Sequence, residues 1–161
     1  MSKGAINFTN NNEYYTPKEL VARFGNMDYD PATTKEKAEE FGVAEYDTIE
    51  TNGLLNDWTK YKRIWINPPF TDKHIFFKKA VETVKKANNE IYFLMPIEFL
   101  TTKRFHNLLD GIGGVLYLPN GRIKFERNIG EPSKSPAFGS VILKLQNESE
   151  LTIKRINIWG R

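Results

Sequence analysis

The tetrapeptide Asn67-Pro68-Pro69-Phe70 has the residue types needed to hold a flat ring that carries an amine. The side-chain oxygen of Asn67 and the carbonyl of Pro68 are two acceptors for the hydrogens of an exocyclic amine. Held in this way, the nitrogen becomes pyramidal and its lone pair is free to attack a methyl sulfonium in line. The two prolines stiffen the loop, and Phe70 offers a face on which an extruded base could stack. The alternative is a plain strand-ending turn, because Asn-Pro and Pro-Pro are ordinary loop dipeptides.

The residues before this tetrapeptide predict the strand that positions it. Ile64-Trp65-Ile66 is a continuous apolar run, which is typical of a strand buried on both faces of a parallel sheet. Proline cannot donate to a central ladder, so the strand must end at Asn67. Open α/β sheets bind their ligands at the carboxyl ends of the strands. We therefore expect the tetrapeptide at the ligand-binding edge of a sheet.

Strand and helix patterns alternate along most of the chain. Capping signals predict helices after Thr16-Pro17 and after Thr33, and apolar spacing predicts another helix over 75–87. This alternation predicts an α/β fold with a mostly parallel sheet, helices on both faces and an antiparallel hairpin at its C-terminal end. Residues 1–13 are polar and are expected to form a flexible lead-in, and 14–161 are expected to form a single domain. Strands are predicted at 27–30, 64–66, 91–95, 114–118, 139–145 and 151–159.

Composition narrows the classes of protein and of site. The 161 residues include no cysteine and only two histidines, so disulfides, thiolate metal sites and histidine-built metal sites are excluded, and we expect no metal. The N-terminus lacks a signal peptide's apolar region, and no run is long enough to span a bilayer. We therefore expect a soluble, cytoplasmic protein with no membrane partner. The net charge of +3 favours a polyanionic partner only weakly.

Four ordered segments resemble those of the phage-type DNA adenine-N6 methyltransferases, the Dam family. The similarity extends over residues 14 to 145, and the ordered set is more specific than any one motif. The segments are Tyr14-Tyr15-Thr16-Pro17; Asp28-Tyr29-Asp30-Pro31-Ala32-Thr33; Asp57-Trp58 with Ile64 to Phe70; and Leu118 to Phe125 with Ser135 to Ser140.

The resemblance implies a Rossmann-like class I methyltransferase that uses S-adenosylmethionine and acts on the N6 amine of a flipped adenine in double-stranded DNA. Asn67, Pro68, Pro69 and Phe70 would then be its catalytic residues. The implied cofactor residues are Tyr15, Thr16 and Pro17 near the amino-acid end of the cofactor, Asp28, Asp30, Pro31 and Ala32 in the same pocket, and Asp57 near the adenine.

Elementary electrostatics agrees with this cofactor pocket. Acids at the strand end could pair with an ammonium, and a helix that begins at Thr33 or Thr34 points amide donors toward a carboxylate. The alternative for Asp28 and Asp30 is an exposed acidic turn or a helix cap, and for Asp57 it is a plain turn.

Two features depart from many methyltransferases. The loop after the first strand reads Asp-Pro-Ala-Thr-Thr and lacks alternating glycines. The carboxylate that would hold the ribose hydroxyls could be Glu45, Asp47 or Glu50, and the sequence does not choose among them.

We expect DNA to be bound by loops, because no separate target-recognition domain is visible in the sequence. The segment between Ala32 and Asn67 is too short to hold one. Arg122, Lys124 and Arg127 are candidates for phosphate or base contacts, and an exposed basic hairpin is the alternative.

Other functions stay open at the level of sequence. The same tetrapeptide would suit methylation of RNA adenine or of a protein glutamine amide. A catalytically inactive DNA-binding, anti-restriction module is a third reading, which the intact tetrapeptide disfavours. A phage-encoded enzyme of this type would act in the host cytoplasm and shield its DNA from restriction.

Overall fold

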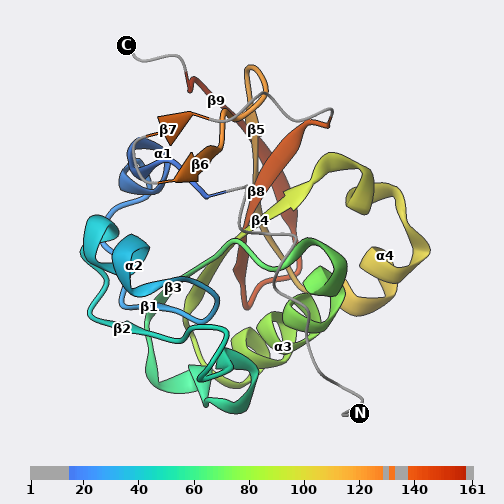
Figure 1. Ribbon diagram of the computed structural model, residues 1–161. Helices are drawn as coiled ribbons and strands as arrows, with labels where there is room; N and C mark the ends of the chain where they lie inside the picture. Colours follow the sequence, from blue (N-terminus) through green and yellow to red (C-terminus); the bar gives the residue numbers. More distant parts are fainter. Residues whose placement is uncertain (1–14, 129–130, 133–137, 159–161) are drawn as a thin grey trace.

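A seven-stranded sheet forms the centre of the protein, whose computed structural model describes residues 15–128, 131–132 and 138–158 (Figure 1). The expected lead-in, residues 1–13, lies outside the described residues. The strand order is β2-β1-β3-β4-β8-β5-β9, and β6 and β7 form a separate two-stranded sheet. The strands are β1 Tyr29–Asp30, β2 Glu45–Tyr46, β3 Arg63–Ile66, β4 Glu90–Pro96, β5 Gly113–Pro119, β6 Glu126–Asn128, β7 Glu131–Pro132, β8 Ser140–Gln146 and β9 Leu151–Ile156. The helices are α1 Lys18–Ala22, α2 Lys35–Phe41, α3 Lys73–Lys86 and α4 Lys103–Leu109, with 3₁₀ turns at Gly53–Leu55, Trp58–Lys60, Phe70–Asp72 and Ile97–Thr101.

Strand direction divides the large sheet into two parts. Strands β2, β1, β3 and β4 pair in parallel, as expected. Strand β8 runs antiparallel between β4 and β5, and β9 pairs in parallel with the other side of β5. The expected C-terminal hairpin is therefore wrong, because β8 and β9 lie on opposite sides of β5.

Two glycines at the start of β5 explain how the chain passes from β8 to β9. The N–H groups of Gly113 and Gly114 donate to the carbonyls of Glu148 and Glu150 at 2.6 and 2.8 Å, so the connection runs directly against β5. A Cβ on Gly113 would lie 2.1 Å from the Glu150 carbonyl oxygen, and one on Gly114 would lie 1.9 Å from that of Lys144. Any side chain at these positions would block the crossing.

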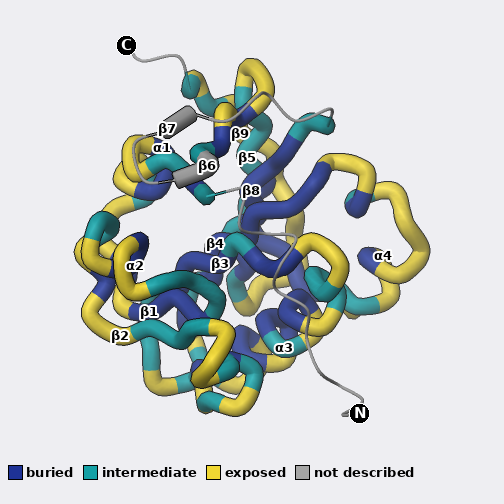
Figure 2. The backbone as a smooth tube through the Cα atoms, viewed as in Figure 1, coloured by how far each residue is buried: buried dark blue, intermediate teal, exposed yellow. Residues whose placement is uncertain are grey.

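Both faces of the sheet are covered, which gives three layers. Side chains alternate along a strand, so Ile64 and Ile66 of β3 enter one apolar cluster while Trp65 enters another. Helix α3 packs on the first face through residues such as Phe76, and α1 packs on the second through residues such as Leu20. The central strands are accordingly the most deeply buried part of the chain (Figure 2). The predicted α/β class is confirmed.

Side-chain caps hold the starts of α2 and α4, whereas α1 and α3 start without one. Thr34 accepts from the Lys37 N–H at the start of α2, and Thr102 accepts from the Phe105 N–H at the start of α4. Helix α1 starts after Pro17 without a side-chain cap, so the expected capping role of Thr16 is wrong. In the described part of the chain, no helix has the length and apolar character that crossing a membrane requires.

Candidate active site

The tetrapeptide Asn67-Pro68-Pro69-Phe70 lies at the carboxyl edge of the sheet, directly after β3. This edge also holds the end of β4 at Pro96, which pairs with Ser140 at the start of antiparallel β8. A small hollow of about 30 Å³, which is open to solvent, lies here. Its lining residues are Asn67, Pro68, Phe70, Lys73, Leu94, Met95, Pro96, Phe125, Phe138 and Ser140.

A hydrogen bond to Thr16 holds the Asn67 side chain. Its Nδ2 atom donates to the hydroxyl oxygen of Thr16 at 3.0 Å, and the Thr16 side chain is buried. Asn67 is half-buried, and Pro68 and Pro69 are buried beside it. The acceptor at position 67 is therefore on a fixed loop and not on a mobile one.

Two aromatic rings meet at the mouth of the hollow. The rings of Phe70 and Phe138 are stacked, with centroids 5.2 Å apart and planes 26° from parallel. Phe70 is 40% exposed, and the Lys73 ammonium lies 4.9 Å from the centre of its ring. Burial lowers the pKa of Lys73, with a smaller contribution from Arg104. Phe138 was not predicted as a site residue, although it belongs to the segment Ser135 to Ser140, of which 135–137 lie outside the described residues.

The Asp30 carboxyl group is buried at the end of β1. Its Oδ1 atom accepts from the Ala32 backbone N–H at 3.0 Å, and no cationic side chain of the described residues pairs with it. Burial raises the pKa of Asp30 to about 7, because a charged carboxylate loses its hydration there. Tyr29 lies in the apolar cluster on the face of the sheet that α3 covers. Because side chains alternate along a strand, Asp30 points to the other face, which α1 covers. Asn67 follows Trp65 by two positions and is therefore on the α1 face as well. The following Pro31 is buried and Ala32 is half-buried.

The N-terminal motif Tyr15-Thr16-Pro17 joins the same face of the sheet. Tyr15 pairs with Glu126 of β6 through backbone hydrogen bonds of 2.9 and 2.8 Å. Thr16 contacts Asn67, as described above, and Pro17 leads into α1. The structure thus brings the predicted N-terminal motif and the tetrapeptide Asn67-Pro68-Pro69-Phe70 together.

A buried lysine that was not predicted lies behind this motif. The Lys37 Nζ atom donates to the Thr16 carbonyl at 2.9 Å and pairs with Glu40 and Glu126 at 2.6 and 2.7 Å. Lys37 follows charged residues in a helical pattern, which favours an exposed position, so the sequence carried no signal for its burial.

Among the three acids considered for a ribose contact, Asp47 lies next to Asp30. Its backbone N–H donates to the Asp30 carbonyl at 3.0 Å, directly after β2. Its carboxylate accepts from the Tyr29 hydroxyl and from Asn56 Nδ2. Glu45 and Glu50 are exposed, and the Glu50 carboxylate accepts from the neighbouring Thr48 hydroxyl.

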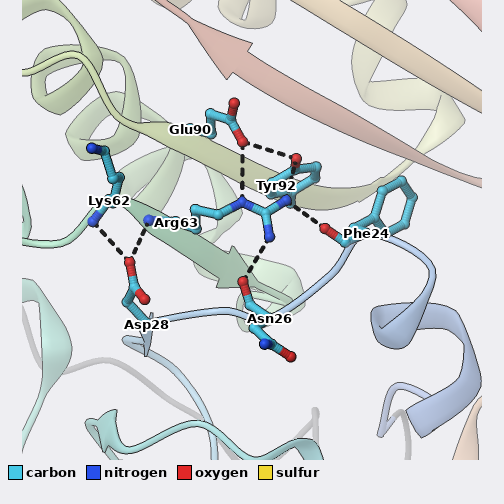
Figure 3. A network of polar contacts seen from close by, with 7 residues as sticks. All are labelled: Phe24, Asn26, Asp28, Lys62, Arg63, Glu90 and Tyr92. Carbon is cyan, nitrogen blue, oxygen red and sulfur yellow. Dashed lines mark hydrogen bonds and ion pairs between the residues drawn. The ribbon is translucent and has the colours of Figure 1, made fainter.

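Asp28 lies at the opposite end of β3 from Asn67. Its Oδ2 atom accepts from the backbone N–H groups of Lys62 and Arg63 at 3.1 and 2.9 Å (Figure 3). The Arg63 guanidinium there also donates to Glu90 and Tyr92 and to the Phe24 and Asn26 carbonyls, which forms a structural network (Figure 3). The structure does not bring Asp28 together with Asp30.

Asp57 caps its own turn. The carboxylate accepts from the Thr59 N–H at 3.0 Å and from the Thr59 hydroxyl at 2.7 Å, at the start of the turn Trp58–Lys60. These hydrogen bonds lower the pKa of Asp57. Trp58 packs in the α3-side cluster, so this turn lies on the other face of the sheet from Asn67.

Two of the three predicted DNA contacts line a second hollow, of about 920 Å³ with its open mouth included. Arg122 and Lys124 form one wall, and α1 forms the other with Arg23, a basic residue that was not predicted. Arg127 belongs to β6, and its side chain lies outside the described residues. The lining residues are Pro17, Glu19, Leu20, Arg23, Arg122, Ile123, Lys124 and Ile158.

Metal ligands do not gather in the described ranges. No three His, Cys, Asp or Glu side chains there lie close enough to hold a metal ion together.

A family model and two phage proteins match this chain. The family model described as DNA N-6-adenine-methyltransferase (Dam) matches residues 7–157. A DNA N-6-adenine-methyltransferase of Escherichia phage T1 is 32% identical over 154 residues, covering 84% of this chain and 63% of the relative. One of Haemophilus phage HP1 is 28% identical over 86 residues, covering 53% of this chain and 49% of the relative. This chain therefore spans less than two thirds of the length of the relatives that it matches. The extent of the family match nevertheless places the protein in the Dam family of DNA N-6-adenine-methyltransferases.

Proposed function

We propose that this protein transfers a methyl group from S-adenosylmethionine to the N6 amine of an adenine turned out of double-stranded DNA. One observation carries the proposal: Asn67-Pro68-Pro69-Phe70 lines a hollow at the carboxyl edge of the sheet, beside a stacked aromatic pair. Family membership supports the same reaction. Both relatives are phage proteins with this activity in their names, which supports DNA adenine methylation as the reaction.

Asn67 and Pro68 would act on the adenine amine. The side-chain oxygen of Asn67 and the carbonyl of Pro68 accept its two hydrogens, and this draws the nitrogen lone pair out of the ring. The base lies against the aromatic pair of Phe70 and Phe138, where stacking offsets the loss of its neighbours in the duplex. Pro69 keeps the acceptors fixed, so little reorganisation is needed during the reaction.

The residues around Asp30 fit S-adenosylmethionine. The cofactor supplies an electrophilic methyl group on a sulfonium. Asp30 is a buried carboxylate without a cationic partner among the described side chains, and the cofactor's ammonium would be such a partner. Asp47, held beside it, is the acid best placed for the ribose hydroxyls. Tyr15, Thr16, Pro17, Pro31 and Ala32 would complete the pocket, and Asp57 stays a candidate for the adenine end.

The fold and charge agree with this assignment. An antiparallel strand inserted between two others of a mainly parallel sheet supports a Rossmann-like class I methyltransferase fold. We infer that residues 14–161 act as a single domain without a separate target-recognition domain. The basic hollow of Arg23, Arg122 and Lys124 would then hold DNA phosphates, with Arg127 nearby in sequence.

A methyl-transfer assay with labelled S-adenosylmethionine tests the proposal. Double-stranded DNA, adenine-containing RNA and a glutamine-rich protein are offered in parallel to wild type and Asn67→Ala. We expect label in DNA, on adenine N6 after hydrolysis, and a strong loss with Asn67→Ala. Label in RNA or protein alone would assign another substrate. Absence of label in all three, across varied DNA sequences, would favour an inactive binding module.

A further inference from the structure

Lys37 is a buried charge that the proposed reaction does not use. Its side chain is 3% exposed, and its ammonium contacts the Thr16 carbonyl at 2.9 Å, Glu40 at 2.6 Å and Glu126 at 2.7 Å. An ammonium has three hydrogens, so these contacts use all of them. A buried ammonium with all its donors paired has little freedom to move. Lys37 is therefore a rigid anchor between α2, β6 and the N-terminal motif.

Thr16 is held by this anchor on one side and contacts Asn67 on the other. Its carbonyl accepts from Lys37, and its hydroxyl oxygen accepts from Asn67 Nδ2 at 3.0 Å. The backbone pairing of Tyr15 with Glu126 fixes the residue before it. Thr16 is also buried, which keeps water from replacing its hydroxyl as a partner of Asn67.

The contact matters because the two ends of an amide have opposite hydrogen-bonding roles. The Asn67 NH₂ end donates, and only its oxygen end can accept from an amine. With Nδ2 bonded to Thr16, the oxygen is at the opposite end of the amide. A rotation of about 180° would present a donor to the amine and abolish the interaction.

We propose that Thr16 is a positioning residue that holds the Asn67 side chain in place through the hydrogen bond between its hydroxyl and the amide, and that Lys37 holds Thr16 in place for this task. This proposal rests on the proposed function, since the amide must accept from the adenine amine. It assigns the Thr16 hydroxyl to the catalytic loop, whereas the sequence assigned the residue to the cofactor.

Two substitutions at position 16 separate the hydroxyl from the shape of the side chain. Thr16→Val keeps the shape and removes the acceptor, and Thr16→Ser keeps the acceptor. Misplacement of a reacting group by about 1 Å can cost on the order of 100-fold in rate. We expect Thr16→Val to slow single-turnover methyl transfer by about that factor, and Thr16→Ser to restore most of the rate.

The same pair of substitutions in an Asn67→Ala background shows through which residue Thr16 acts. If Thr16 works by holding the Asn67 side chain in place, Thr16→Val slows wild type but changes the rate of Asn67→Ala by less than about twofold. An equal loss in both backgrounds overturns the inference, because Thr16 would then act independently of Asn67. Equal rates of Thr16→Val and Thr16→Ser in the protein that keeps Asn67 overturn the inference as well.

Nuclear magnetic resonance of the side-chain amides gives a readout that does not need the reaction. The Asn67 NH₂ signals are identified by their disappearance in Asn67→Asp, and Asn89, whose Nδ2 donates to the Tyr61 carbonyl at 3.2 Å, is the matched control. We expect Thr16→Val, but not Thr16→Ser, to move the Asn67 signals and leave those of Asn89 in place. Unmoved Asn67 signals overturn the contact. A wild type that transfers no methyl group, with the expected shift of these signals, overturns the proposed function and not the contact.

Discussion

The ring of Phe70 lies stacked on the ring of Phe138, with the two centroids 5.2 Å apart, at the mouth of the hollow beside Asn67. One ring follows β3 and the other precedes β8, so the pair joins two segments that are far apart in the sequence. A flat base entering the hollow would meet an aromatic surface contributed by both.

We expect Phe138→Ala to weaken methyl transfer to DNA about as much as Phe70→Ala. Loss of one aromatic stack costs about 1–3 kcal/mol, and kcat/KM for DNA should fall accordingly. Ile153→Ala is the control, since Ile153 is also exposed but lies on the edge strand β9. A Phe138→Ala enzyme with the kcat/KM of the Ile153 control would show that the base does not use this ring.

Asn67→Ala should slow methyl transfer by on the order of 100–1000-fold, because a preorganised acceptor is lost. Asn67→Asp keeps an acceptor at the same place and should retain much more activity. The Thr16 hydroxyl can turn to donate to this carboxylate, so the substituted side chain stays held. Single-turnover rates with saturating cofactor give the comparison. Equal rates for wild type and Asn67→Ala would contradict the mechanism.

Asp30→Asn should abolish measurable S-adenosylmethionine binding in calorimetry, because it removes the carboxylate that faces the cofactor's ammonium. The folded pKa of about 7 lies above the value of about 4 for an unfolded Asp. Between these values the folded protein holds an extra proton, so the contribution of Asp30 to stability falls as pH rises from 4 to 7. Cofactor affinity should instead increase with pH up to about 7, as the carboxylate ionises.

Glu39→Gln is the control for this charge change, because Glu39 is exposed on α2. Asp28→Asn is the second comparison, and we expect it to lower thermal stability without lowering affinity, since Asp28 bonds the start of β3. Wild-type affinity in Asp30→Asn would move the cofactor site elsewhere.

Replacing Arg23, Arg122 and Lys124 with Ala should weaken DNA binding and flatten its dependence on salt. Each phosphate contact that is lost lowers the slope of log K against log salt by about 0.9. The matched control removes Lys78 and Lys86, two exposed cations of α3 on the other face of the sheet. Equal slopes in the two variants would exclude the hollow as the DNA-binding surface.

Lys37→Met should lower the free energy of unfolding by about 3–5 kcal/mol, because two partly buried carboxylates lose their shared cation. Chemical denaturation measures the change. Adding Glu40→Gln to Lys37→Met should recover part of the loss, since one of the carboxylates that lose the Lys37 cation is neutralised. A double variant as unstable as the single one would mean that packing, and not charge, determines the effect.

The sequence predicted β3 and its tetrapeptide because both signals are local. An apolar run next to two prolines determines where the strand ends, whatever the rest of the chain does.

The remaining errors concern contacts made across the fold. Asp28 and Asp30 are identical in type and two positions apart, yet one meets the backbone of Lys62 and the other is buried at the strand end. Lys37 has the sequence pattern of an exposed helix face, yet it is buried, and it pairs there with Glu126 of β6, which is far away in the sequence. Contacts between segments that are far apart in the sequence leave no local sequence pattern from which they could be predicted.

The position of β8 in the sheet determines when the sheet can form during synthesis of the chain. Strand β4 is synthesised early, but its partner on one side is β8, which emerges after β5. Until then the edge of β4 stays open to pairing with another chain, which is a hazard for self-association during synthesis. The hollow beside Asn67 is equally incomplete, since Phe138 and Ser140 arrive with β8. Translation must therefore pass β8 before either the sheet or the site can close.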